Sequence, residues 1–195
     1  MTRTSAWTAL LLAAATLAGC SSPPKTNFYT LSPAAASAPA RADAKVPYSV
    51  AIGPVGVPES LDRPQMVTRT GANQVSVAEF ERWAGPLKNE IALAIAENLK
   101  PLLGGASVFT YPQGVNADVH VSVDVQRFDS VLGEAATVEV LWQVRTVKGA
   151  PRSGRSMVRE AAGGAGYDAL VAAHARALAA ASRDIAAAIQ AARTP

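Results

Sequence analysis

The sequence is poor in the residues that build most metal and thiol sites. It has one cysteine and two histidines, His120 and His174, among 195 residues. A single cysteine excludes an internal disulfide and a cysteine-based zinc cluster, and two distant histidines disfavour a histidine-rich metal site. Charged residues make up only 17%, the net charge is +3, and no run of lysine or arginine occurs, so nucleic-acid binding is not expected.

Large apolar side chains are also fewer than the hydrophobic content suggests. Hydrophobic residues make up 49% of the chain, but 41 residues are alanine and only 6% are aromatic. Alanine favours helix but buries little area, so the core must depend on scattered valine, leucine, isoleucine and aromatic residues.

Recognisable catalytic motifs are lacking as well, including a nucleophile elbow, a phosphate loop, a zinc-protease helix and paired carboxylates. The G-x-G-x-x-A pattern at 164–169 has no parallel strand after it, so it is interpreted as a turn into a helix. His120, flanked by Asp118, Ser122 and Asp124, is typical of a solvated strand face. His174 is interpreted as a histidine at the boundary of the core. We predict no enzyme, no metal and no cofactor.

The N-terminus has the pattern of a secretory signal. Arg3 precedes an uncharged stretch, and the apolar segment 6–17 is shorter than the ~20 residues of a membrane-spanning helix. It ends in Leu17-Ala18-Gly19-Cys20, which resembles the bacterial lipobox. The alternatives are an ordinary signal peptide with a chance cysteine, or a buried helix. We predict that residues 1–19 are removed, and that Cys20 carries a covalent lipid. Residue 21 is serine and not aspartate, which in bacterial lipoproteins favours transfer to the outer membrane.

The remaining chain predicts a tether over 20–45, with a possible short strand at 27–31, and one domain over 46–195. The stretch 32–45 is rich in alanine, proline and serine and is interpreted as a loop. Strands are expected at 48–57, where Gly53-Pro54 bends the strand or places it at an edge, and at 65–70 and 73–77. Strict alternation predicts a half-buried strand over 115–125, which continues into a meander with strands at 137–147 and 154–161.

Two periodic segments predict long amphipathic helices. One stripe leads from Phe80 and Trp83 through Leu87 to Leu102, with Pro86 at the first helical position and Gly104-Gly105 at the end. The second helix spans 167–192. The fold class is therefore α+β: a single domain with a mainly antiparallel sheet and two long helices packed on one face.

The segment Leu61-Asp62-Arg63-Pro64-Gln65-Met66-Val67-Thr68-Arg69 stands out by its composition. Its simplest interpretation is a turn held by an Asp62–Arg63 or local backbone hydrogen bond. The same composition suits a partner or subunit surface, with Asp62, Arg63, Gln65 and Arg69 as its polar groups. Trp83 is a candidate anchor for that surface, although a core aromatic is the more common case.

These residues carry a resemblance to a known family. The stretches at 50–55 (VAIGPV), Pro58, 61–69 (LDRPQMVTR), 82–87 (RWAGPL) and 97–99 (ENL) resemble the PqiC-type ABC-transport auxiliary lipoproteins. The segments at 29–31 and 178–186 extend the similarity over nearly the whole mature chain.

The resemblance implies a non-enzymatic lipoprotein of the outer membrane that faces the periplasm. It implies an accessory role in a lipid transport system with an MCE-domain tunnel protein and an ABC transporter, which protects membrane integrity. Copies are expected to form a homo-oligomeric ring at the end of the tunnel. Two alternatives stay open: a lipoprotein that binds lipid or solute in its own cavity, and a structural lipoprotein that assists outer-membrane assembly.

Overall fold

The computed structural model describes residues 24–33, 48–104, 106–147 and 149–193. The predicted signal peptide, Cys20, Ser21 and nearly all of the predicted loop at 32–45 lie outside the described residues.

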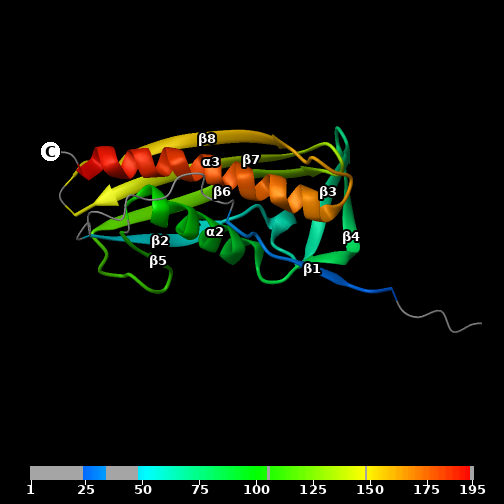
Figure 1. The fold of residues 1–195 in the computed structure, drawn as a ribbon, viewed down its shortest axis with the longest axis horizontal. Coiled ribbons are helices and arrows are strands. Elements are labelled where there is room, and N and C mark those ends of the chain that lie inside the picture. Colours follow the sequence, from blue (N-terminus) through cyan, green and yellow to red (C-terminus); the bar gives the residue numbers. More distant parts are fainter. Residues whose placement is uncertain (1–23, 34–47, 105, 148, 194–195) are drawn as a thin grey trace, which may run out of the picture.

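Valine-rich strands form a five-stranded sheet in the order β5-β2-β6-β7-β8 (Figure 1). The strands are β2 (Ser49–Gly56), β5 (Ser107–Thr110), β6 (Val119–Val131), β7 (Ala135–Thr146) and β8 (Arg152–Ala161). β6, β7 and β8 form the predicted antiparallel meander, whereas β2 runs parallel to both β5 and β6. The sheet is therefore mixed.

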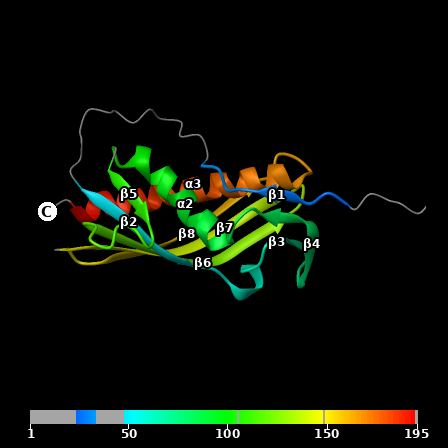
Figure 2. The ribbon, with the colours of Figure 1, turned by 90° about the horizontal axis from the view of Figure 1, so that it is seen from below.

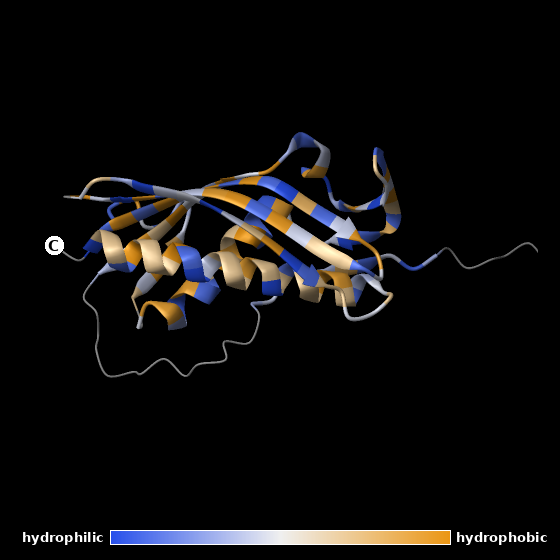
Figure 3. Ribbon diagram, turned by 90° about the horizontal axis from the view of Figure 1, so that it is seen from above, coloured by the Kyte–Doolittle hydropathy of each residue, from blue (hydrophilic) through white to orange (hydrophobic). Residues whose placement is uncertain are grey.

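Two helices cover one face of this sheet (Figure 2). α2 (Leu87–Leu102) lies over β2 and β5, and α3 (Tyr167–Arg193) lies over β7 and β8. The strands alternate between hydrophobic and hydrophilic residues (Figure 3), because neighbouring side chains point to opposite faces. The core forms where the apolar faces meet, and Val138, Val140, Leu178 and Ile185 are fully buried there. The predicted α+β architecture is confirmed.

A second, three-stranded sheet lies at one end of the molecule, in the order β1-β4-β3. It consists of β1 (Asn27–Tyr29), β3 (Gln65–Gly71) and β4 (Gln74–Trp83). β3 and β4 form an antiparallel hairpin, and β1 runs parallel to β4. A short 3-10 helix, η2 (Glu59–Leu61), connects β2 to this sheet. The expected strand within 27–31 is confirmed.

α3 runs from this end of the molecule to the opposite end. Its 27 residues span about 40 Å. Its first residue is Tyr167, whose ring centroid lies 6.3 Å from that of Tyr29 in β1. At its last turn, Arg152 at the start of β8 donates to the carbonyl of Ala191 over 3.2 Å. The turn between β7 and β8 is therefore at the end far from β1, where Figure 1 also shows the C-terminus.

Three boundaries differ from the sequence prediction. Phe80 and Trp83 do not lead into a helix but belong to β4, because Pro86 blocks helix continuation upstream and α2 begins at Leu87. Pro86 is the residue before the first helical one, and Gly104 beyond the helix has φ 66°, as its position predicted. The strand expected from Val115 begins only at Val119.

β2 shows the predicted effect of Gly53-Pro54. Its register against β6 shifts between Ile52 and Val55, and its pairing with β5 ends at Ile52. Among the described residues, the second half of β2 pairs only with β6. Pro54 lies within the register shift and has no partner in that ladder, so its missing N–H costs no ladder hydrogen bond. No helix within the described ranges is long and apolar enough to span a membrane.

Candidate functional site

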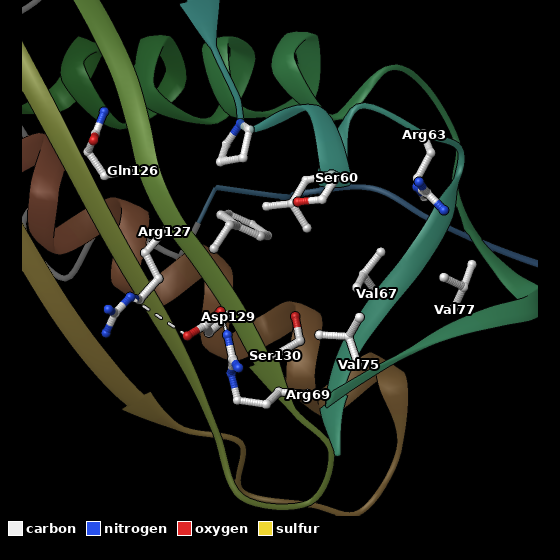
Figure 4. A pocket seen from close by; sticks show the side chains of 13 residues that line it. Ser60, Arg63, Val67, Arg69, Val75, Val77, Gln126, Arg127, Asp129 and Ser130 are labelled. Atoms are coloured by element: carbon white, nitrogen blue, oxygen red, sulfur yellow. Dashed lines mark hydrogen bonds and ion pairs between the residues drawn. The ribbon is translucent and has the colours of Figure 1, made fainter. Parts of the chain in front are cut away.

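An open groove of about 300 Å³ lies between the three-stranded sheet and β6 (Figure 4). The connection around η2 contributes Ser60, Leu61 and Arg63, and the β3–β4 hairpin contributes Val67, Arg69 and two valines. β6 supplies the remaining wall with residues 126–130. The groove thus joins part of the distinctive 61–69 segment to a strand that lies about 60 positions further along the chain.

Three arginines and one aspartate set the charge of the groove. Arg69 Nη2 lies 2.9 Å from Asp129 Oδ1, and Arg127 Nε lies 3.7 Å from Asp129 Oδ2. The hydrogen bond and the charge of Asp129 raise the pKa of Arg69, so this guanidinium stays charged. The guanidinium of Arg63 makes no ion pair among the described residues. Three cations against one carboxylate leave an excess of positive charge.

Apolar side chains of the β3–β4 hairpin lie beside these charges. Val67 on β3 is paired with Val77 on β4, and Arg69 is paired with Val75. Val75 and Val77 are both exposed although they are large aliphatic residues. A groove with an aliphatic wall and surplus guanidinium groups suits an amphipathic, negatively charged segment. The valines would contact its apolar part, and arginine makes paired hydrogen bonds to carboxylate groups.

A bulge in β6 brings Arg127 and Asp129 into the groove. Val125 is paired with Val140 and Arg127 with Glu139, so Gln126 is one extra residue on β6. From this point the alternation is reversed: Phe128 and Ser130 are buried, and Arg127 and Asp129 point outward. The sequence analysis missed these two residues. The sequence does contain a sign of the bulge: Gln126 and Arg127 are two successive polar residues where strict alternation predicts only one.

Beneath the groove, Ser130 Oγ lies 2.7 Å from His174 Nε2, a contact that a nucleophile and its base also make. His174 is fully buried, its ring is stacked on Phe128 with centroids 3.8 Å apart, and burial lowers its pKa to about 3. No described residue hydrogen-bonds His174 Nδ1, so the orienting third group of a triad is missing from the described part of the chain. The pair joins α3 to β6, and the prediction that His174 is a boundary residue is wrong.

The predicted interface residues separate in the structure. Arg63 and Arg69 line the groove, but Asp62 and Gln65 do not. Asp62 forms an ion pair with Lys88 over 3.2 Å, and the turn is held by the Arg63 amide, which donates to the Leu61 carbonyl over 2.8 Å. Gln65 is partly buried at the start of β3.

Trp83 is 5% exposed and packs edge to face against Phe128, with ring centroids 6.1 Å apart. It belongs to the core, so the candidate role as a surface anchor is withdrawn.

The polar residues around His120 do not converge on a site. Asp118 accepts hydrogen bonds from the amide and hydroxyl of Ser49, which lower its pKa. Asp124 accepts a hydrogen bond from Gln126 over 2.6 Å, and His120 is exposed. Among the residues described, no group of three or more histidine, cysteine, aspartate or glutamate side chains is arranged to hold a metal ion. The glycines at 164 and 166 form the turn into α3, as predicted.

Comparison with known proteins identifies the family. The family model of the ABC-type transport auxiliary lipoprotein component matches residues 29–186, and the chain belongs to this family. It is therefore a membrane-anchored lipoprotein that serves ABC-type transport. A search of the curated proteins finds no match.

Two solved structures share the fold at low sequence identity. An uncharacterized protein is 22% identical, with a TM-score of 0.71 over 85% of this chain and 99% of that one. A Xanthomonas campestris protein of the DUF330 family is 18% identical, with a TM-score of 0.65 over 87% and 100%. A PelC dodecamer from Paraburkholderia phytofirmans is 17% identical, with a TM-score of 0.40 over 67% and 83%. That last likeness is too weak to bear on assembly.

Proposed function

We propose that the protein is held in the outer membrane by acyl chains on Cys20 and faces the periplasm. There it acts as a non-enzymatic accessory subunit of a system in which an MCE-domain protein and an ABC transporter move lipids between membranes and preserve membrane integrity. The observation that carries this proposal is the family match over residues 29–186, which establishes a lipoprotein component of ABC-type transport.

The groove is the proposed contact site for the partner or for a neighbouring subunit of a ring. Its support is geometric: the distinctive 61–69 segment folds so that Arg63 and Arg69 meet Arg127 beside exposed valines. Exposed arginine next to apolar side chains is the composition in which protein interfaces concentrate their binding energy. Asp62 and Gln65 lie at the border of this surface, where Asp62 keeps Lys88 in place.

The test is capture of the acylated protein by its MCE partner, together with its oligomeric state in detergent. Arg63→Ala combined with Arg69→Ala removes two groove cations, and we expect loss of capture or a shift from oligomer to monomer. Arg145→Ala combined with Arg183→Ala is the matched control, because it removes the same charge at exposed positions outside the groove.

Both double variants are first checked for an unchanged melting temperature. Unchanged capture and unchanged oligomeric state in the groove variant would disprove the contact site. Failure of the wild-type protein to bind any MCE protein encoded beside it would disprove the wider proposal.

A further inference from the structure

The outer face of β1 and β4 exposes two aromatic rings at the end of the molecule where the described chain begins. Phe28 is 65% exposed and Phe80 is 40% exposed. Phe28 is paired with Arg82, and Phe80 precedes Arg82 by two residues on β4. Tyr29 and Trp83, their neighbours in the register, point to the opposite face and pack against the core. Phe28 therefore points away from the domain, and the nearby ring of Phe80 is also in contact with water.

Two cations lie near Phe28. Arg82 is its partner in the register, and Lys25 is exposed three residues before it. Glu81 is paired with Asn27 and points to the other face, where it accepts hydrogen bonds from Asn27 over 3.0 Å and from Tyr29 over 2.6 Å. Aromatic rings beside lysine and arginine are the side chains that settle at the boundary between phospholipid headgroups and acyl chains.

The distance to the predicted acylation site limits where this face can lie. Phe28 follows Cys20 by eight positions, and even a fully extended chain of that length spans only about 28 Å. Acyl chains on Cys20 would therefore keep the Phe28 face close to the bilayer. The far end of α3, about 40 Å away, is free to project from it.

We propose that the outer face of β1 and β4, formed by Phe28, Phe80 and Arg82 with Lys25, docks on the phospholipid bilayer that holds the acyl chains. The acyl chains supply the affinity, and this face sets the orientation of the domain on the membrane. The far end of the sheet then points into the periplasm. This inference rests on the acylation of Cys20, which is part of the proposed function.

The lone cysteine makes a direct test possible. Once Cys20 is acylated the chain has no other thiol, so Phe28→Cys or Phe80→Cys accepts a single environment-sensitive fluorophore. The acylated full-length mature protein is reconstituted into vesicles of phosphatidylethanolamine and phosphatidylglycerol that contain brominated lipid. We expect a blue-shifted emission that the bromine atoms quench at both positions.

Val147→Cys is the control, because Val147 is 80% exposed in the turn between β7 and β8 at the opposite end. Its label should stay unquenched. Adding Arg82→Glu to the Phe80→Cys protein should reduce quenching, since a carboxylate next to the rings repels anionic headgroups.

Labels at 28 and 80 that behave like the label at 147 in an acylated protein would overturn the inference and leave the proposed function intact. Cross-linking between two copies at Phe28→Cys without quenching would also overturn it and would assign this face to a subunit interface. Mass spectrometry that finds no acyl chains on Cys20 would overturn both. The vesicles contain no MCE protein, so partner binding does not influence the result.

Discussion

The helix-covered face of the five-stranded sheet differs from the three-stranded sheet in how its apolar side chains are covered. Val140 on β7 lies under α3 and is fully buried, and the small alanines of α3 let the helix approach the strands closely. On β4, Val75, Val77 and Phe80 are exposed although they are equally apolar. The first region holds the domain together. The second leaves apolar surface beside arginines and is suited to contacts with other molecules.

The sharpest test of this comparison is the same substitution in both regions. Val140→Ala removes two buried methyl groups and leaves a cavity, so we expect the free energy of unfolding to fall by about 2–3 kcal/mol. Val77→Ala on the hairpin should lower it by less than about 1 kcal/mol, because that side chain is already in contact with water. Urea unfolding measures both values, and equal losses would contradict the comparison.

A smaller effect is expected from the buried His174, which joins α3 to β6. Burial lowers the pKa of His174 to about 3, whereas an unfolded histidine titrates near 6.5. Between pH 3 and pH 6.5 the unfolded state binds a proton at His174 that the folded state does not bind. The free energy of unfolding is therefore retained above pH 6.5 and falls as the pH is lowered. From pH 7 to pH 5 this amounts to roughly 2 kcal/mol.

His174→Gln removes the titrating group and keeps a partner for Ser130. The glutamine variant should therefore lose less stability than the wild type between pH 7 and pH 5, measured by urea unfolding at each pH. Parallel pH profiles for the two proteins would show that His174 is protonated in the folded state as readily as in the unfolded one.

The smallest effect on stability is expected in the groove itself. Arg69 and Asp129 form a partly exposed ion pair, and such pairs contribute little to folding. Asp129→Asn should leave the melting temperature within the error of the measurement while it increases the positive charge of the groove. Capture of an acidic partner should then become tighter at low salt. Weaker capture would indicate that the aspartate, and not the arginines, is recognised.

Local patterns predicted the regular elements well, and they failed where distant segments meet. The alternation in β6 and β7 and the periodicity of α3 were read correctly, because burial on one face imposes a period that a single element displays. The spacing of Phe80 and Trp83 continues that of Leu87 and predicts a helix, whereas the pairing of β4 with β1 and β3 shows a strand. The parallel pairing of β2 with β5 and β6 leaves no local signal, since it depends on segments about 60 residues apart.

The family, the two amphipathic helices, the meander and the unusual composition of the 61–69 segment can be recognised from the sequence alone, because each of them is a pattern of neighbouring residues. The three-dimensional packing places Arg63 and Arg69 in one groove with Arg127, and it buries Trp83 and His174 in the core. Those outcomes depend on which faces the packed elements bury, and a bulge at Gln126 reverses that assignment for half a strand. One extra residue in β6 thus separates the polar wall of the groove from the core behind it.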